Sequence, residues 1–164
     1  MKMVLAMLLS LVVSAPALAM AQDVRWQDIV GVITAQNVDN PVADIDSGTF
    51  AWSTRNGQAS VNLTTGAASF VVQGLVINGT QFSGTPGPIT AVTGTLVCNA
   101  GAAAEAVLDT AAVPLSSLGH AQFGGHIQGI PNPCSNPLFL IRIATPAGAA
   151  GRWIATGTER FIAH

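Results

Sequence analysis

Two internal histidines, His120 and His126, are the residues in this chain best suited to metal chemistry. Neutral imidazole is the commonest ligand for zinc or copper in proteins. Both lie in the glycine-rich segment 119–130, which predicts an extended strand with a bulge at its paired glycines. In such a strand the two rings lie about 20 Å apart. A shared metal would therefore need a sharp fold at the bulge, or one histidine could instead join Asp109 or Glu105 across a strand pair.

A second candidate metal site is the polar segment 37–48, which contains Asp39, Asp44 and Asp46. Carboxylate oxygens are the ligands that calcium prefers. Only Asp44 and Asp46 match the alternating aspartates of a calcium loop, so these two are the candidate calcium ligands. Loops also gather aspartate for turn formation, and the alternative interpretation is a solvated loop.

The chain contains few residues suited to covalent or acid–base catalysis. The chain has no tyrosine, and its one lysine, Lys2, precedes the segment that we expect to be removed. No G-x-S-x-G sequence marks a nucleophile, and no set of nucleophile, base and orienting acid is apparent. Glycosidases use two carboxylates that lie close together in space. The candidates for such a pair are Glu105, Asp109 and Glu159, but their positions in the sequence do not show whether any two of them meet. We therefore expect a protein that is not an enzyme and needs no cofactor.

Cys98 and Cys134 are the only cysteines. An even number in an exported chain predicts a disulfide between them. In the chain-entropy description, closing a loop of this length stabilises a fold by about 3 to 4 kcal/mol.

The first 21 residues resemble a secretory signal peptide. A single positive charge precedes a short apolar run, and small residues follow that allow cleavage after Ala19 or Ala21. This predicts a secreted or periplasmic protein, with residues 22–164 forming a single domain. Without Lys2, five arginines stand against eight carboxylates, which gives 5 − 8 = −3. That balance does not suit nucleic acid or anionic lipid, so we expect neither a nucleic-acid partner nor a membrane after cleavage.

Strand patterns and turn signals fill the rest of the chain. Residues 49–77 predict a three-strand meander with turns at Asn56-Gly57 and Thr65-Gly66, because Asn-Gly suits a type I′ hairpin turn. Apolar or alternating runs predict further strands within 23–38, 89–98, 105–110, 138–144 and 152–162. With no helix signal after the first segment, we expect an antiparallel β-sandwich of about nine or ten strands. Trp26, Trp52 and Trp153 then belong to its core, with a sugar-stacking platform as the alternative.

Several short sequences resemble a group of small exported bacterial proteins without a known activity. They include G-Q-A-S-V-N-L-T-T-G, F-V-V-Q-G-L, P-L-F-L-I-R-I-A and G-R-W-I-A-T-G. The resemblance implies a β-rich fold and brings no site residues. The function expected is that of an exported binding or structural module, with a protein partner or self-association through strand edges. The alternative is a metal-dependent protein using His120 or His126.

Overall fold

The computed structural model describes residues 22–145 and 147–163, with side chains described as far as Thr158. The predicted signal peptide at residues 1–21 lies outside the described residues. The described chain contains eleven strands and no helix. The strands are β1 (Asp23–Gly31), β2 (Trp52–Ser53), β3 (Asn56–Asn62), β4 (Ala67–Gln73), β5 (Val76–Ile77), β6 (Ala91–Cys98), β7 (Ala106–Asp109), β8 (Val113–Pro114), β9 (Ala121–His126), β10 (Leu138–Ala144) and β11 (Ala150–Ala163).

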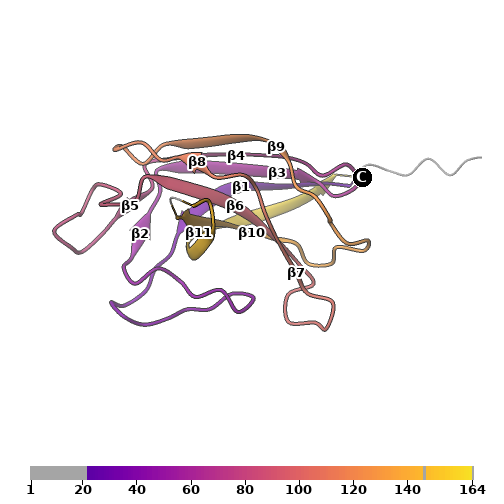
Figure 1. The fold of residues 1–164 in the computed structure, drawn as a ribbon, viewed down its shortest axis with the longest axis horizontal. Coiled ribbons are helices and arrows are strands. Elements are labelled where there is room, and N and C mark those ends of the chain that lie inside the picture. Colours follow the sequence, from indigo (N-terminus) through magenta and orange to yellow (C-terminus); the bar gives the residue numbers. More distant parts are fainter. Residues whose placement is uncertain (1–21, 146, 164) are drawn as a thin grey trace, which may run out of the picture.

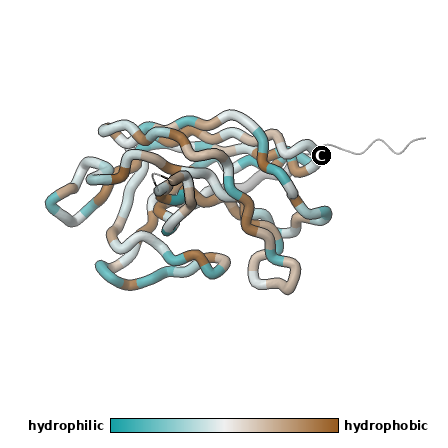
Figure 2. Tube along the Cα trace, viewed as in Figure 1, coloured by the Kyte–Doolittle hydropathy of each residue, from teal (hydrophilic) through white to brown (hydrophobic). Residues whose placement is uncertain are grey.

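Nine strands form one sheet in the order β7-β6-β10-β11-β1-β3-β4-β9, and β8 pairs with β6 beside this path. Every pairing between these strands is antiparallel. The sheet curls into a half-barrel, with β9, β4 and β3 along the upper side of Figure 1 and β6 and β10 below them. Strands β2 and β5 form a separate small sheet. Hydrophilic segments concentrate in the peripheral loops (Figure 2).

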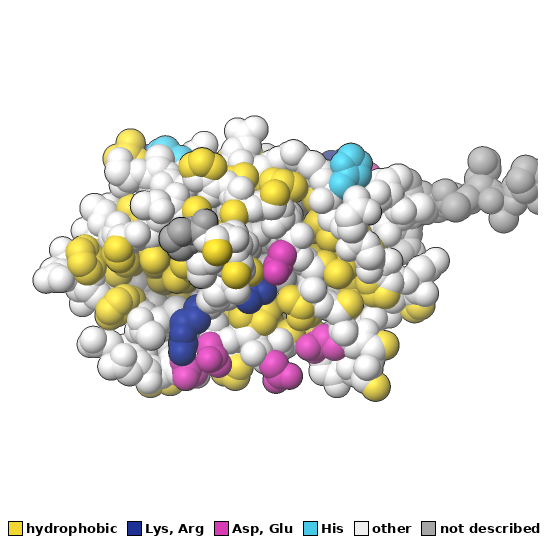
Figure 3. All heavy atoms as spheres, viewed as in Figure 1, with side chains coloured by type: hydrophobic (Ala, Val, Ile, Leu, Met, Phe, Trp, Pro, Cys, Tyr) yellow, Lys and Arg dark blue, Asp and Glu magenta, His cyan; other side chains and the backbone are white. Residues whose placement is uncertain are grey.

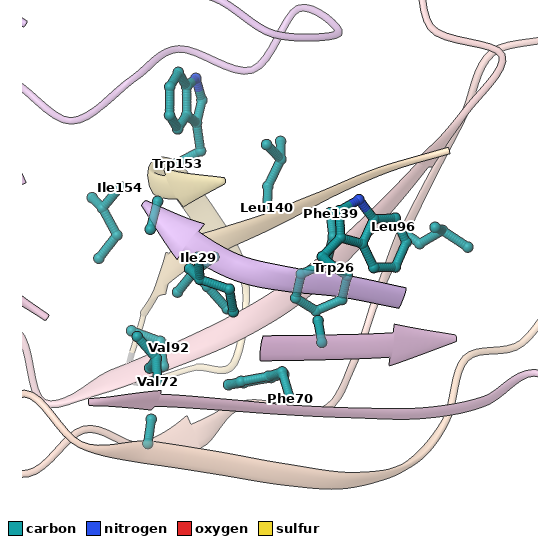
Figure 4. Close-up of a cluster of buried hydrophobic side chains, with 14 of the residues drawn as sticks. Trp26, Ile29, Phe70, Val72, Val92, Leu96, Phe139, Leu140, Trp153 and Ile154 are labelled. Carbon is teal, nitrogen blue, oxygen red and sulfur yellow. The ribbon is translucent and has the colours of Figure 1, made fainter. Parts of the chain in front are cut away.

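The curled sheet packs one half of itself against the other around a single core. Phe70 of β4 lies 5.9 Å, between ring centroids, from Phe139 of β10, and Trp26 of β1 lies 5.3 Å from the same Phe139 ring. In Figure 4, Trp26, Phe70 and Phe139 lie between the two halves of the sheet, whereas Trp153 points away from them. A Cβ placed on Gly94 of β6 would lie 2.7 Å from Phe139 and 2.9 Å from Phe70, so the glycine lets the halves approach. The antiparallel all-β fold, predicted as a β-sandwich of about nine or ten strands, is confirmed; the described chain has eleven strands, in one curled sheet and one small sheet.

The meander prediction is wrong at Asn56 and Gly57. Both lie inside β3, where they pair with Gln73 and Val72 of β4, and β2 pairs with β5 instead. Gly57 does not have the positive φ that a type I′ turn requires. It is needed for close packing, because a Cβ on Gly57 would lie 2.6 Å from the Cβ of Ile29 in β1. The second predicted turn is confirmed by the φ of 77° at Gly66.

The bulge predicted at Gly124 and Gly125 is also wrong. These glycines pair in unbroken register with Ser69 and Ala68 of β4. The edge position of β9 accounts for the difference, since a strand with one partner tolerates glycine without any break in its ladder. The six-residue strand therefore runs straight from Ala121 to His126.

The long segment between β1 and β2 is held to the sheet through Trp153 of β11. The Trp153 main chain donates to the carbonyl of Asp46 and accepts from the N–H of Gly48, at 3.0 and 2.7 Å. Its indole N–H donates to the carbonyl of Asn40 at 2.9 Å. One buried residue thus satisfies three backbone groups of a segment that has no regular ladder of its own.

The predicted disulfide between Cys98 and Cys134 is confirmed. Cys98 ends β6 with its side chain fully buried, and Cys134 lies in the segment between β9 and β10. The bond closes over a sequence separation of 36 residues. It therefore ties the β9–β10 connection to the end of β6.

Candidate binding surfaces

The structure places His120 and His126 at opposite ends of β9. The Nδ1 of His120 accepts a hydrogen bond from the N–H of Gly74 at 3.2 Å, so this histidine holds the chain where β4 ends. His126 is exposed and lies opposite Ala67 of β4. Figure 3 shows histidine side chains at two well-separated places. Because the six residues of β9 run in unbroken register and an extended strand rises about 3.3 Å per residue, the two imidazoles lie too far apart to share one metal ion.

The acidic groups expected near the histidines have other partners. Asp109 accepts from Thr95 and from Arg142 at 2.5 and 3.2 Å, and Glu105 accepts from the N–H of Gly101 at 2.6 Å. Among the described residues no group of three histidine, cysteine or acidic side chains is arranged to hold a metal ion. The metal site predicted at His120 and His126 therefore gains no further ligand from the described fold.

The aspartate loop is organised by an arginine. Arg152 of β11 pairs with Asp39 at 2.5 Å and with Asp46 at 3.5 Å, and it donates to the carbonyl of Ser47 at 2.8 Å. The hydrogen bond that Arg152 donates to Asp39 raises the pKa of Arg152 above its ordinary value, and the charges of both aspartates add to this effect. A fixed guanidinium already sits beside Asp46, one of the two predicted calcium ligands. The other, Asp44, has a positive φ of 56° in the same loop.

A second polar cluster lies on the outer side of β6 and β10 and is structural. Thr93 and Thr95 are buried on β6, and Arg142 opposite them donates to the carbonyls of Ala150 and Gly151. No buried side-chain nitrogen or oxygen among the described residues lacks a hydrogen bond. Since the donors and acceptors are already paired, this cluster offers no group to a substrate. Figure 3 shows basic side chains beside acidic ones on one face of the molecule.

The three tryptophans belong to the core, as predicted. Trp26, Trp52 and Trp153 are 2%, 3% and 3% exposed. A sugar-stacking platform needs an exposed ring face, so this alternative does not hold for these residues.

Strand β9 is an open edge of the large sheet. The N–H of Ile127 donates to the carbonyl of Gly66, which lies opposite it when the β4–β9 register is continued by one residue. Ile127 and Gly66 therefore form a hydrogen-bonded pair of the ladder. Hydrogen-bonded pairs alternate in an antiparallel ladder, so Gly125 and Phe123 also bond toward β4. The N–H and C=O groups of Gly124 and His126 therefore point away from the sheet. No described group bonds to them.

Strand β8 does not close this edge. A tight turn, in which the N–H of Ser116 donates to the carbonyl of His120, brings β8 back beside the beginning of β9. Yet β8 pairs only with β6. Pro114 of β8 has no N–H to donate to a further strand, and no β8–β9 ladder forms.

The open edge also lacks the usual protection. Exposed edges in proteins are commonly guarded by lysine, proline, a bulge or an inward charge. Strand β9 reads A-Q-F-G-G-H, with no proline, no bulge and only His126 as a titratable group. A Cβ on Gly124 would meet nothing within 4 Å, so an approaching strand has room. The opposite edge, β7, carries Asp109 and follows Glu105.

A polar surface lies next to this edge on the outer side of β1, β3 and β4. Successive strands place Arg25, Ser60, Ser69 and Gly124 side by side in one row. The hydroxyls of Ser60 and Ser69 are hydrogen-bonded to each other at 2.9 Å. A hollow of about 290 Å³ opens beside the row. This arrangement is suited to a hydrogen-bonding ligand.

The sequence did not predict the open edge at β9 or the polar surface around Arg25. In 67–73 the sequence shows apolar residues at both alternate sets of positions and so did not indicate a polar side. What brings Arg25 beside these residues is the pairing of β1 with β3, which no short-range signal encodes.

Comparisons with known proteins add no assignment: the chain matches no family, no curated protein and no solved structure. Among its described residues no helix is long and apolar enough to cross a membrane.

Proposed function

We propose that this chain is an exported, non-enzymatic binding module of the cell envelope or extracellular space that binds an extended segment of a protein partner along β9. The signal-like N-terminal sequence and a disulfide, which forms in oxidising compartments, support the location. The observation that carries the binding proposal is the free backbone of Gly124 and His126 at an unprotected edge.

Strand addition uses the groups that this edge presents. A partner segment pairs its main chain with the outward N–H and C=O groups, and alternate side chains contact the two faces of the sheet. Phe123 stands on the inner face beside Phe70, with ring centroids 5.8 Å apart. An apolar side chain of the partner segment, at the position facing Phe123, would extend this aromatic pair.

The test compares two substitutions at one position. Gly124→Pro removes the outward N–H and leaves the β4–β9 hydrogen bonds intact, whereas Gly124→Ala keeps the N–H and has free space for its Cβ. Binders selected from a random extended-peptide library on the oxidised protein provide the probe. We expect at least tenfold weaker peptide binding for Gly124→Pro and less than threefold for Gly124→Ala, consistent with loss of one backbone hydrogen bond and a clash of the proline ring.

Amide hydrogen exchange reports the binding site directly. Bound peptide should slow exchange at Gly124 and His126, whose N–H groups are free in the unbound protein. Sedimentation at high protein concentration shows whether a second copy takes the place of the partner; self-association lost in Gly124→Pro would assign the same edge to a homodimer. A library that yields no binder sensitive to Gly124→Pro, together with a monomer at all concentrations, rejects the proposal.

A further inference from the structure

We propose that Asn78 is a site of spontaneous modification, where the side-chain amide is converted to aspartate and isoaspartate through a cyclic imide with Gly79. The proposal does not rest on strand addition at β9, because it concerns the segment after β5 and needs no partner. Its evidence is a comparison between two Asn-Gly pairs of the same chain, Asn56-Gly57 and Asn78-Gly79.

The reaction is a general property of an asparagine followed by glycine. The backbone nitrogen of the glycine attacks Cγ of the asparagine, and the proton that it loses leaves with the amide nitrogen as ammonia. Water then opens the five-membered imide at one of its two carbonyl carbons, which gives aspartate or isoaspartate. Water is the only co-reactant. Because the glycine nitrogen must turn toward Cγ, the structure around each pair decides whether it reacts.

The peptide unit between Asn78 and Gly79 is free to make this rotation. Asn78 is exposed, and neither its carbonyl nor the N–H of Gly79 has a hydrogen-bond partner among the described residues. Gly79 has a φ of 70°, and a Cβ placed on it would meet nothing within 4 Å. An unbonded peptide unit beside glycine rotates at low cost. The attacking nitrogen therefore has the freedom that ring closure needs.

The backbone on either side of this peptide unit is anchored. The N–H of Asn78 donates to the carbonyl of Ala51 at 2.8 Å, and the N–H of Thr80 donates to Oγ of Ser83 at 3.0 Å. These contacts hold the two reacting residues close to each other. Motion is thereby confined to the one unit between them.

Ser53 of β2 contacts the amide that is attacked. Its hydroxyl donates to Oδ1 of Asn78 at 3.3 Å. Attack on Cγ places negative charge on this oxygen, and a hydrogen bond to a developing oxyanion stabilises the transition state. The hydroxyl of Ser53 is therefore placed to speed ring closure.

Asn56-Gly57 has the same sequence in a different environment. Both residues belong to β3 and pair with Gln73 and Val72 of β4. Gly57 is buried, and a Cβ placed on it would lie 2.6 Å from the Cβ of Ile29. Rotation of this peptide unit would break the strand pairing and drive the backbone into Ile29. The fold therefore protects Asn56 and leaves Asn78 reactive.

The experiment follows both asparagines in one sample. Oxidised protein is incubated at mildly alkaline pH in heavy-oxygen water and digested, and mass spectrometry measures label uptake at each asparagine. An isoaspartate-specific methyltransferase identifies the isoaspartyl product. We expect Asn78 to react at least about tenfold faster than Asn56 in the native protein. In guanidinium chloride the two rates should converge, because the unfolded chain exposes both pairs.

Three variants assign the chemistry. Asn78→Gln should abolish the modification at this position, because a glutamine side chain would have to close a larger ring. Gly79→Ala should slow the reaction by about tenfold or more, because a Cβ crowds the attacking nitrogen and disfavours the positive φ. Ser53→Ala should slow it about two- to tenfold, as the loss of one hydrogen bond predicts. Thermal unfolding checks that each variant is folded.

Two results would overturn the site: Asn78 stays intact in the native protein while it reacts in guanidinium chloride, or Asn56 and Asn78 react at equal rates in the native protein. An unchanged rate in Ser53→Ala would reject the assistance by its hydroxyl. Gly124→Pro should leave the rate at Asn78 unchanged, so failure of the strand-edge proposal and failure of this one are told apart.

Discussion

Replacing Gly94 with alanine tests the packing of the two halves of the sheet. The new Cβ would lie 2.7 Å from Cζ of Phe139 and 2.9 Å from two ring carbons of Phe70. Real Cβ atoms do not approach other carbons this closely, so two rings from different strands must both shift. Overpacking of this kind costs about 1 to 3 kcal/mol. We expect Gly94→Ala in the upper half of that range, because neither ring can leave the buried core.

Urea unfolding of the oxidised protein, followed by tryptophan fluorescence, measures this loss. Thermal unfolding measures it as well. Because the midpoint temperature of a domain of this size changes by roughly 3 to 5 °C per kcal/mol, we expect the midpoint of Gly94→Ala to be about 6 to 15 °C lower than that of the parent protein. Gly124→Ala is the matched control, because it adds the same methyl group to a strand glycine with nothing within 4 Å. We expect that control to stay within about 0.5 kcal/mol of the parent protein.

A double-mutant cycle identifies the contact responsible. Phe139→Leu removes the ring atom nearest to Gly94 and by itself should cost about 1 to 2 kcal/mol through the cavity that it leaves. Combined with Gly94→Ala, it should cost less than the sum of the single changes by about 1 kcal/mol or more, since the added methyl occupies that cavity. An unchanged stability in Gly94→Ala, or strict additivity in the double variant, would refute face-to-face packing at this point.

Three further predictions concern the disulfide, the aspartate loop and the metal hypothesis. Replacing Cys98 and Cys134 together by alanine should reduce the free energy of unfolding by about 4 kcal/mol for a closed loop spanning 36 residues, measured by urea unfolding; a loss below about 1 kcal/mol would contradict it. Arg152→Met should speed proteolytic cleavage within residues 32–51, because the Asp39 and Asp46 pairs and the bond to Ser47 are lost, and a cleavage rate equal to that of the parent would show that these contacts do not hold the loop. Zinc, copper or calcium should leave the midpoint temperature of thermal unfolding within about 1 °C of its value in EDTA. A metal that did bind, at about 100 times its dissociation constant, would instead stabilise the fold by roughly 2.7 kcal/mol. A rise of several degrees that His126→Ala abolishes would restore the metal hypothesis.

The proposed β9 site offers main-chain groups, which any extended polypeptide can pair with, so its selectivity must come from side chains at alternate positions.

Local patterns in the sequence were enough to predict the class of fold. Runs rich in β-branched residues, alternating in 89–98 and almost continuously apolar in 138–144, predicted most of the longer strands. The turn at Gly66 and the pairing of Cys98 with Cys134 followed from residue type and number. The core position of the tryptophans followed from their hydrophobic bulk.

Features that depend on contact between distant segments were decided by the tertiary structure. Asn56-Gly57 has the composition of a turn, but Ile29 of a different strand makes Gly57 a packing glycine. Arg152 and Asp39 are 113 residues apart and still form an ion pair. Strand order likewise determined which backbone groups remain free at β9 and which side chains surround Arg25. A local pattern carries the periodicity of one strand, whereas the identity of its neighbours depends on the packing of the whole sheet.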